Sequence, residues 1–237
     1  MTEAQSPVVA IFGATGAIGG ALTATFRSIG WRVLGVSRQP PQADDAQNWV
    51  QWTYGGGAGG LEGLPTALIQ AVVWAQGINF SDDVRTYDAA AHAAMYEANV
   101  LVILESLQQM LRLKLLDSGA RLCIISSIWQ DLAREKKLSY CVTKSALKGL
   151  VQSLAIDLGR DGILVNAVLP GALDTPMTRA NLEDDQIDRL KQMAPLRSLP
   201  QLADVANLVT FLCSAQNTGL TGQFVSADRG FSYAKFV

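Results

Sequence analysis

Tyr140 and Lys144, two side chains that can carry out acid/base chemistry, stand four positions apart just past the middle of the chain. In a helix, both side chains would lie on one face, about one turn from each other. Free tyrosine has a pKa of about 10 and is a poor base near neutral pH. A neighbouring positive charge favours the phenolate and so brings that pKa closer to the working range. The same spacing occurs by chance in many helices, so the rest of the chain must support a proton-transfer pair.

A glycine-rich turn near the N-terminus has the features of a phosphate-binding turn. Residues 8–12 are an apolar, β-branched run typical of a buried strand, and residues 18–29 have the periodicity of a helix that ends at Gly30. Glycines at a strand-to-helix turn allow backbone N–H groups and a helix N-terminus to approach a pyrophosphate. We therefore predict a dinucleotide site here; the alternative is a tight turn without a ligand. Its candidate residues are Gly13, Thr15, Gly16, Ile18 and Gly19.

The second strand, residues 31–36, is followed by Ser37 and Arg38. Proteins that bind NAD usually place an acidic residue near this point, whereas an arginine accommodates the 2′-phosphate of NADP. The first acidic residue after this strand is Asp44. The sequence therefore favours NADP over NAD as the cofactor. The alternative is an exposed arginine at the end of a strand.

The composition excludes several classes of protein. The chain has 237 residues, of which 49% are apolar and 17% charged, and its net charge is −2, which is typical of a compact soluble globule. It has no basic block that would bind nucleic acid and no apolar run of the ~18 residues that span a membrane. The N-terminus lacks a signal-peptide pattern, so we expect a cytoplasmic protein. Three cysteines (Cys123, Cys141 and Cys213) and the single His92 indicate neither a disulfide framework nor a metal site.

Strands and helices alternate along the whole chain, which predicts a single α/β domain built on a doubly wound parallel sheet with helices on both faces. Further strands are expected at 49–54, 71–75, 121–126, 163–169 and 222–227, and helices at 88–113, 140–158 and 202–214. The glycine run at 55–60 lacks the ending of a P-loop and is expected to be a flexible turn. Residues 176–199, with Met177, Leu182 and Met193 among acidic residues, are expected to form a lid over the substrate.

Four features follow one another in a fixed order: the glycine turn, Asn99 in a helix, Ser127 at a strand end, and Tyr140 with Lys144. In this order the chain resembles the short-chain dehydrogenase/reductase family over nearly its whole length. The resemblance implies a Rossmann-like domain in which Tyr140 gives or takes the substrate proton. It also implies that Lys144 lowers the pKa of the tyrosine and binds the nicotinamide ribose. Ser127 would then hydrogen-bond the substrate oxygen, and Asn99 would hold a water in a proton relay.

Two further segments extend the resemblance. Residues 166–175 are similar to the Pro-Gly segment of the family, which implies that Pro170, Gly171, Leu173 and Thr175 contact the cofactor, with the Leu173 backbone and the Thr175 hydroxyl at the carboxamide. Residues 220–223 resemble its C-terminal turn.

Three segments depart from the family pattern. Ala17 stands where the standard short form carries glycine. The segment Trp-Ala-Gln-Gly at 74–77 replaces Asn-Asn-Ala-Gly and keeps only Gly77, which we assign to the cofactor. Thr53 and Tyr54 replace an aspartate near the adenine.

The substrate side is expected between Ser127 and Tyr140. Trp129 is expected to wall the substrate pocket or stack on a flat substrate, or else to pack on neighbouring loops. Arg134, Lys136 and Lys137 would either attract an acidic substrate such as a carboxylate or phosphate ester, or form a solvated charged loop.

The leading functional hypothesis is an NADP-preferring oxidoreductase that interconverts a carbonyl and a secondary alcohol. The alternatives are a dinucleotide-binding sensor or scaffold without turnover, and an epimerase or dehydratase, which the spacing of the glycines suggests. The protein is expected to bind a small-molecule substrate and to bind neither nucleic acid nor a membrane. The resemblance also implies a homodimer or homotetramer, assembled through the helices that contain Asn99 and follow Tyr140.

Overall fold

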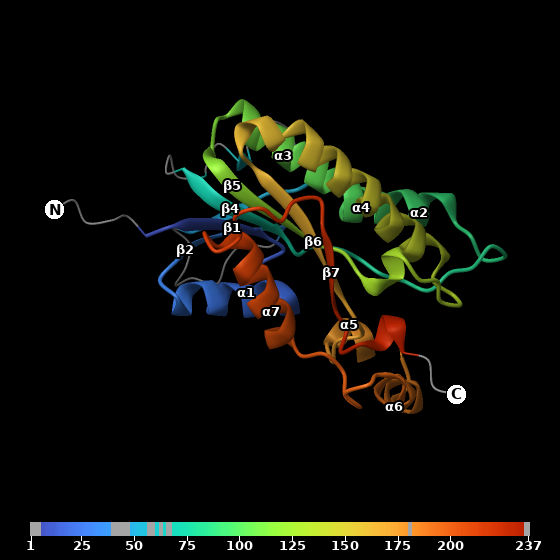
Figure 1. Cartoon of the computed structure of the whole chain (residues 1–237). Helices are drawn as coiled ribbons and strands as arrows, with labels where there is room; N and C mark the ends of the chain where they lie inside the picture. The colour runs from blue at the N-terminus through green and yellow to red at the C-terminus, as the bar shows by residue number, and fades with distance from the viewer. Residues whose placement is uncertain are drawn as a thin grey trace.

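The computed structural model describes residues 6–38, 48–55, 60–61, 64, 68–179 and 182–234. Within these ranges, seven parallel strands form one sheet in the order β3-β2-β1-β4-β5-β6-β7 (Figure 1). The strands are β1 (Val8–Phe12), β2 (Arg32–Ser37), β3 (Trp49–Gln51), β4 (Ile69–Trp74), β5 (Leu116–Ile125), β6 (Leu164–Pro170) and β7 (Phe224–Ala227). The order reverses between β1 and β4, and such a reversal is where ligands bind in open α/β sheets.

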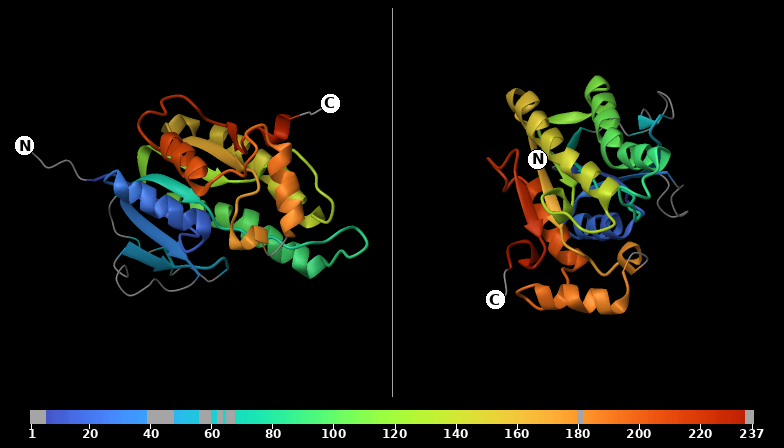
Figure 2. Two further views of the ribbon diagram at one scale, coloured as in Figure 1. Left: turned by 90° about the horizontal axis from the view of Figure 1, so that it is seen from below. Right: turned by 90° about the vertical axis from the view of Figure 1, so that its right-hand side faces the viewer.

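Helices cover both faces of the sheet, as predicted. Figure 1 shows α3 and α4 on one side and α1 and α7 on the other, while α2 continues the layer of α3 and α4. Two further helices, α5 and α6, lie together at one end of the molecule, away from these layers (Figure 2). The bounds are α1 (Ala17–Ser28), α2 (Ala89–Tyr96), α3 (Val102–Arg112), α4 (Leu138–Asp157), α5 (Pro176–Arg179), α6 (Asp184–Met193) and α7 (Leu202–Cys213). The 3₁₀ turns are η4 (Ile128–Gln130), η5 (Gly159–Asp161) and η6 (Phe231–Tyr233).

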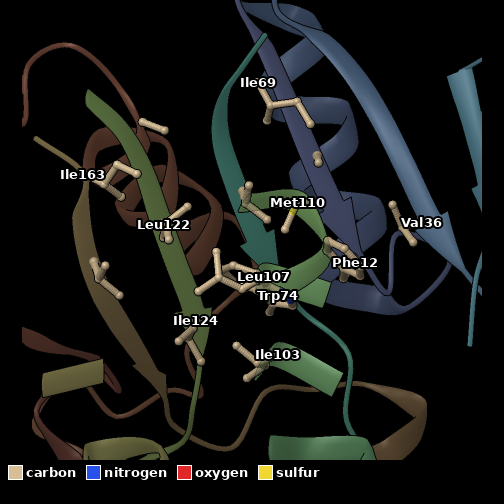
Figure 3. Close-up of a cluster of buried hydrophobic side chains, with 14 of the residues drawn as sticks. Phe12, Val36, Ile69, Trp74, Ile103, Leu107, Met110, Leu122, Ile124 and Ile163 are labelled. Carbon is tan, nitrogen blue, oxygen red and sulfur yellow. The ribbon is translucent and has the colours of Figure 1, made fainter. Parts of the chain in front are cut away.

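The sheet is apolar on both faces because both are covered by helices. Phe12 of β1 belongs to the cluster under α3 and α4, whereas its neighbour Ile11 belongs to the cluster under α1 and α7. Trp74 is the largest fully buried side chain of the first cluster, and its indole Nε1 donates to Ser106 Oγ at 2.9 Å, which joins β4 to α3. Figure 3 shows this cluster between the strands and α3, with Ile103, Leu107 and Met110 pointing at the sheet.

The continuous helix predicted at 88–113 is interrupted. After α2 the chain makes a π-helical turn, η3 (Glu97–Leu101), before α3 begins. A π turn places one extra residue in the helix, and such turns occur frequently at functional sites. Asn99 lies in this turn and is 1% exposed. Apolar periodicity predicted the helical run, but it does not reveal the hydrogen-bond pattern inside the run.

Two strands differ from their predicted bounds by more than two residues, while the others agree to within two. The edge strand β3 ends at Gln51, because only β2 pairs with it, and the chain then turns toward the cleft that Thr53 and Tyr54 line. Strand β5 begins at Leu116 rather than at residue 121, since an irregular pairing with Ile69 extends it. The predicted glycine turn at 55–60 lies largely outside the described residues. No helix within the described ranges is long and apolar enough to cross a membrane.

The packing of α1 on the glycine turn yields a test of the fold. A Cβ atom on Gly19 would lie 2.2 Å from the carbonyl oxygen of Gly13, so the start of α1 would have to move. Gly19→Ala should therefore lower the free energy of unfolding by roughly 1–3 kcal/mol, measured by urea denaturation. Gly20→Ala is the matched control, because a Cβ there meets nothing nearer than 4.0 Å, and alanine favours the helix. Equal losses in the two variants would contradict this packing.

Candidate active site

A cleft of about 700 Å³ opens at the carboxyl ends of the strands and extends from the glycine turn to the start of α4. This volume lies within the range of roughly 300–1,000 Å³ that is usual for small-molecule and cofactor sites. Most of the predicted site residues line it: Gly13, Thr15, Gly16, Ile18, Ser37, Arg38, Gly77, Ser127, Trp129, Tyr140, Pro170, Gly171, Leu173 and Thr175. The other three, Gly19, Asn99 and Lys144, are buried behind this lining.

The glycine turn is shaped by close backbone contacts. Gly13 has a positive φ of 74°, and a Cβ atom on it would lie 2.7 Å from the backbone nitrogen of Gln76. Gly16 is the N-cap of α1 and has no side chain to cap it, so the first N–H groups of the helix face the cleft without a side-chain acceptor. A helix N-terminus of this kind favours an anionic group such as a phosphate.

Gln76 is a site residue that sequence analysis did not assign. Its side chain lines the cleft beside Gly13, and neither polar atom of its buried amide has a hydrogen-bond partner among the described residues. A buried amide without partners costs about 1–3 kcal/mol, so a polar ligand in the cleft would relieve it. The signal was present in the sequence, since Gln76 stands in the segment that departs from the family pattern.

Ser37 and Arg38 lie at the carboxyl end of β2, on the same side of the cleft. The hydroxyl of Ser37 is buried and accepts a hydrogen bond from Trp49 Nε1 at 2.9 Å. Arg38 is exposed, and its backbone carbonyl accepts from Gln51 Nε2 at 2.9 Å. The guanidinium therefore extends from a fixed backbone at the mouth of the cleft.

Tyr140, Ser127 and Lys144 converge at the other end. Tyr140 is in the first turn of α4 and lines the cleft with Ser127, whose hydroxyl is close enough to lower the pKa of the phenol. Ser127 caps η4, accepting from the backbone nitrogen of Trp129 at 3.3 Å. One turn further along α4, Lys144 places its Nζ 5.7 Å from the centre of the Tyr140 ring and donates to the backbone carbonyl of Ile125 at 3.0 Å.

The electrostatics differ from the prediction made for this pair. Burial raises the pKa of Tyr140 to about 12, although the Ser127 hydroxyl acts in the opposite direction. Burial also lowers the pKa of Lys144 to about 8. The pKa of Tyr140 therefore shows no net depression, because removing the phenol from water disfavours its charged form more strongly than a neighbouring cation favours it.

Asn99 joins three segments of the site through the hydrogen bonds of its buried side chain. Its Nδ2 donates to the carbonyl of Ile78 at 3.1 Å and to Thr143 Oγ1 at 3.0 Å, and its Oδ1 accepts from the Ile78 nitrogen at 2.9 Å. Gly77 permits this approach, since a Cβ atom there would lie 2.9 Å from Asn99 Oδ1. The side chain thus links η3, the loop after β4, and α4.

The loop between Ser127 and Tyr140 contains three basic residues in three environments. Lys136 is exposed and Arg134 is half-buried at the cleft. Lys137 is 2% exposed and its Nζ donates to Asn79 Oδ1 at 3.0 Å, to the carbonyl of Phe80 and to Ser81 Oγ. A solvated charged loop and an anion-binding loop were the two alternatives, and Lys137 fits neither.

A second buried contact at the start of α4 was not predicted. The Ser139 backbone nitrogen donates to Asp82 Oδ1 at 3.0 Å, and its hydroxyl donates to the same carboxylate. On its other side, Ser139 Oγ hydrogen-bonds His92 Nδ1 at 2.8 Å. The order of these groups differs from that of a nucleophilic triad, since serine rather than histidine stands in the middle.

Trp129 and the segment after β6 close the substrate side. Trp129 lines the cleft and also packs edge-on against Phe231, with ring centres 6.4 Å apart, so both predicted placements occur together. Pro170 ends β6, Leu173 is buried, and Thr175 Oγ1 accepts from the Thr178 nitrogen at 3.3 Å. Within the predicted lid, Thr178 and Leu182 line the cleft, whereas Met193 is exposed.

Comparison with known proteins agrees with this architecture. The sequence pattern of the family described as Enoyl-(Acyl carrier protein) reductase matches residues 67–232. The human (3R)-3-hydroxyacyl-CoA dehydrogenase is 36% identical over 118 residues, which cover 49% of this chain and 45% of that protein. The chain thus spans about half the length of the curated relatives it matches.

Solved structures match over a longer range. An oxidoreductase of the short chain dehydrogenase/reductase family from Burkholderia thailandensis is 27% identical, with a TM-score of 0.81 over 96% of this chain and 93% of that one. A gluconate 5-dehydrogenase from Burkholderia cenocepacia, in complex with NADP and tartrate, has the same fold at 19% identity, with a TM-score of 0.89 over 98% of both chains. The family pattern, the sheet order and the convergence of Ser127, Tyr140 and Lys144 lead to one conclusion: the chain belongs to the short-chain dehydrogenase/reductase family.

Proposed function

We propose that the protein is an NADP-preferring oxidoreductase that interconverts a carbonyl and a secondary alcohol. The observation that carries the proposal is that Ser127 and Tyr140 line the same cleft, which begins at a helix N-terminus. The names of the relatives support it, since (3R)-3-hydroxyacyl-CoA dehydrogenase and 3-oxoacyl-[acyl-carrier-protein] reductase both describe redox chemistry at an oxygen-bearing carbon.

The cleft fits a dinucleotide along its length. The turn at Gly13 and Gly16 leaves backbone N–H groups for a pyrophosphate, and the unpartnered amide of Gln76 lies beside it. Arg38 would hold the 2′-phosphate. At the other end, Lys144 would hold the nicotinamide ribose, while Thr175 and the Leu173 backbone would hold the carboxamide. When bound, the nicotinamide supplies the hydride.

Tyr140 would move the proton. Its pKa of about 12 keeps the phenol protonated at neutral pH, which suits a group that donates to the oxygen of a carbonyl as that oxygen gains negative charge. Ser127 would donate to the same oxygen, and Lys144 would place a positive charge beneath the phenol. Asn99 would hold a water behind them. This water would continue the proton path toward the solvent.

A lid and a subunit interface complete the proposal. Residues 176–199 would act as the lid, because Thr178 and Leu182 line the cleft from this segment. A homodimer or homotetramer would assemble through α3 and α4, which expose apolar side chains on their outer faces. These include Leu104, Leu111, Val142 and Ile156.

Removal of the Tyr140 hydroxyl tests the chemistry. With NADPH and a panel of ketones, Tyr140→Phe should lower kcat by about 10²- to 10⁴-fold, as expected for the loss of a general acid, while NADPH affinity stays unchanged. Tyr87→Phe is the control, since this tyrosine is half exposed and contacts His92 outside the cleft. Unchanged turnover in Tyr140→Phe would sink the proposed mechanism.

Arg38 tests the choice of cofactor. Arg38→Ala should weaken NADPH binding by roughly 10- to 100-fold, because a charge-assisted contact to the 2′-phosphate is lost, and should leave NADH binding unchanged. Titration of each cofactor by fluorescence measures both affinities. Arg32→Ala is the matched control, because Arg32 begins the same strand at its other end. If Arg38→Ala keeps the wild-type preference for NADPH, the assignment of the 2′-phosphate site is wrong.

The pKa of Lys144 predicts a pH dependence. Lys144 carries its charge below about pH 8 and loses it as the pH rises through that value. Without the charge, the phenol becomes a weaker acid, so kcat/KM for carbonyl reduction should be level at neutral pH and fall above about pH 8. Lys144→Arg keeps the charge and should move the fall to higher pH. An identical fall in both proteins would assign it to another group, such as Lys137, whose pKa is also lowered to about 8.

A further inference from the structure

Arg134 brings a positive charge to the substrate end of the cleft. It lies in the loop that leads from η4 to α4 and lines the same wall as Trp129 and Tyr140. The side chain is half-buried. The nucleotide-binding end of the cleft, marked by Arg38 and the glycine turn, is formed by β1 and β2 instead. Arg134 is therefore placed to meet a substrate rather than a dinucleotide.

This charge has no acidic partner in the part of the chain that the structure describes. None of the ion pairs found there includes Arg134. Burial lowers its pKa, and no carboxylate offsets the effect. The charge of Arg134 also lowers the pKa of the nearby Lys137, and Asp82 acts in the opposite direction on that lysine. For Arg134 itself no carboxylate of the described residues does so, and a cation partly withdrawn from water is unfavourable unless an anion joins it.

Within the described ranges, no acidic side chain near Arg134 takes the position of a counter-ion, so a ligand can take it. The cleft that Arg134 lines also has apolar side chains, among them Trp129, Ala172 and Leu182. Glu97 lines the same cleft from η3, but it is exposed and forms no ion pair with Arg134. Asp82 instead bonds to Ser139 at the start of α4. A guanidinium at the rim of an apolar pocket recognises a carboxylate or phosphate through two parallel N–H donors.

We infer that the substrate carries an oxyanion, a carboxylate or a phosphate ester, which Arg134 binds while Ser127 and Tyr140 hold the reacting oxygen. The inference rests on the proposed function, because it names the substrate class of the same site. It also separates the three basic residues of this loop. Only Arg134 has both access to the cleft and a charge without an acidic partner, since Lys136 is exposed and Lys137 is hydrogen-bonded to the segment after β4.

Matched pairs of substrates test the inference. One pair is a 3-oxo acid and its methyl ester, and the other is a phosphorylated hydroxyketone and its dephosphorylated form. NADPH oxidation gives kcat/KM for each. Wild type should prefer the charged member of one pair by about 10- to 100-fold, and Arg134→Met should lose that preference because its kcat/KM for the charged member falls. The pair that shows the preference identifies the anion.

Lys136→Asn is the matched control. It removes the same charge from the same loop at an exposed position, and asparagine tolerates the positive φ of 58° found there. This variant should keep the wild-type preference. An unchanged preference in Arg134→Met, or an equal loss in Lys136→Asn, would overturn the inference.

A binding measurement separates this inference from the proposed function. If the neutral ketones are reduced but no charged partner is favoured, the inference fails and the proposed function stands. If nothing in the panel is reduced, calorimetric titration with the 3-oxo acid, the phosphorylated hydroxyketone and their neutral partners still decides. A charged compound that binds wild type more tightly than its neutral partner, and loses this advantage in Arg134→Met, supports the inference. Equal affinities within both pairs overturn it.

Discussion

Buried hydrogen bonds hold the start of α4 against the loop that follows β4, and the position of the reacting groups depends on them. Lys137 donates from one side to Asn79 and Phe80, and Ser139 donates from the other to the carboxylate of Asp82. Tyr140 is the next residue. Hydrogen bonds to charged groups contribute roughly 1.5–3 kcal/mol each, and breaking one here would leave a buried charge or dipole unpaired. The first turn of α4 is therefore restricted to one position, and the phenol with it.

A second contact, at Gly77, brings the side-chain amide of Asn99 and the ammonium of Lys144 to the same part of the site. Asn99 is carried into the site by a π turn, and Gly77 leaves the space that a side chain would fill. A Cβ atom on Gly77 would meet Asn99 Oδ1 at 2.9 Å and Lys144 Nζ at 3.9 Å. Because Gly77 has no side chain, η3 and α4 can place the polar groups of Asn99 and Lys144 beside the loop after β4. The position of Lys144 follows from this packing as much as from its spacing along α4.

Sequence reasoning succeeded where the determinants are local. The strand–glycine–helix start, the alternation of elements and the spacing of Tyr140 and Lys144 are properties of short segments, and the structure places them as predicted. It failed where distant segments decide. Lys137 belongs to a charged loop by sequence, but its burial is set by residues 79–81. The π turn at Asn99 follows from contacts to Ile78 and Thr143, and the direction of the Tyr140 pKa shift follows from its burial.

The cleft also concentrates groups that a sequence selected only for stability would avoid. Burial is the cause of the lowered pKa of Lys144, and the neutral carbonyl of Ile125 cannot balance its charge. The amide of Gln76 is buried nearby without a partner among the described residues. Apolar side chains of similar size at both positions would remove these penalties. Unfavourable buried groups of this kind are expected at functional sites. The buried charge of Lys144 and the unpartnered amide of Gln76 lie at the same cleft, and this is a physical argument that the cleft binds a ligand.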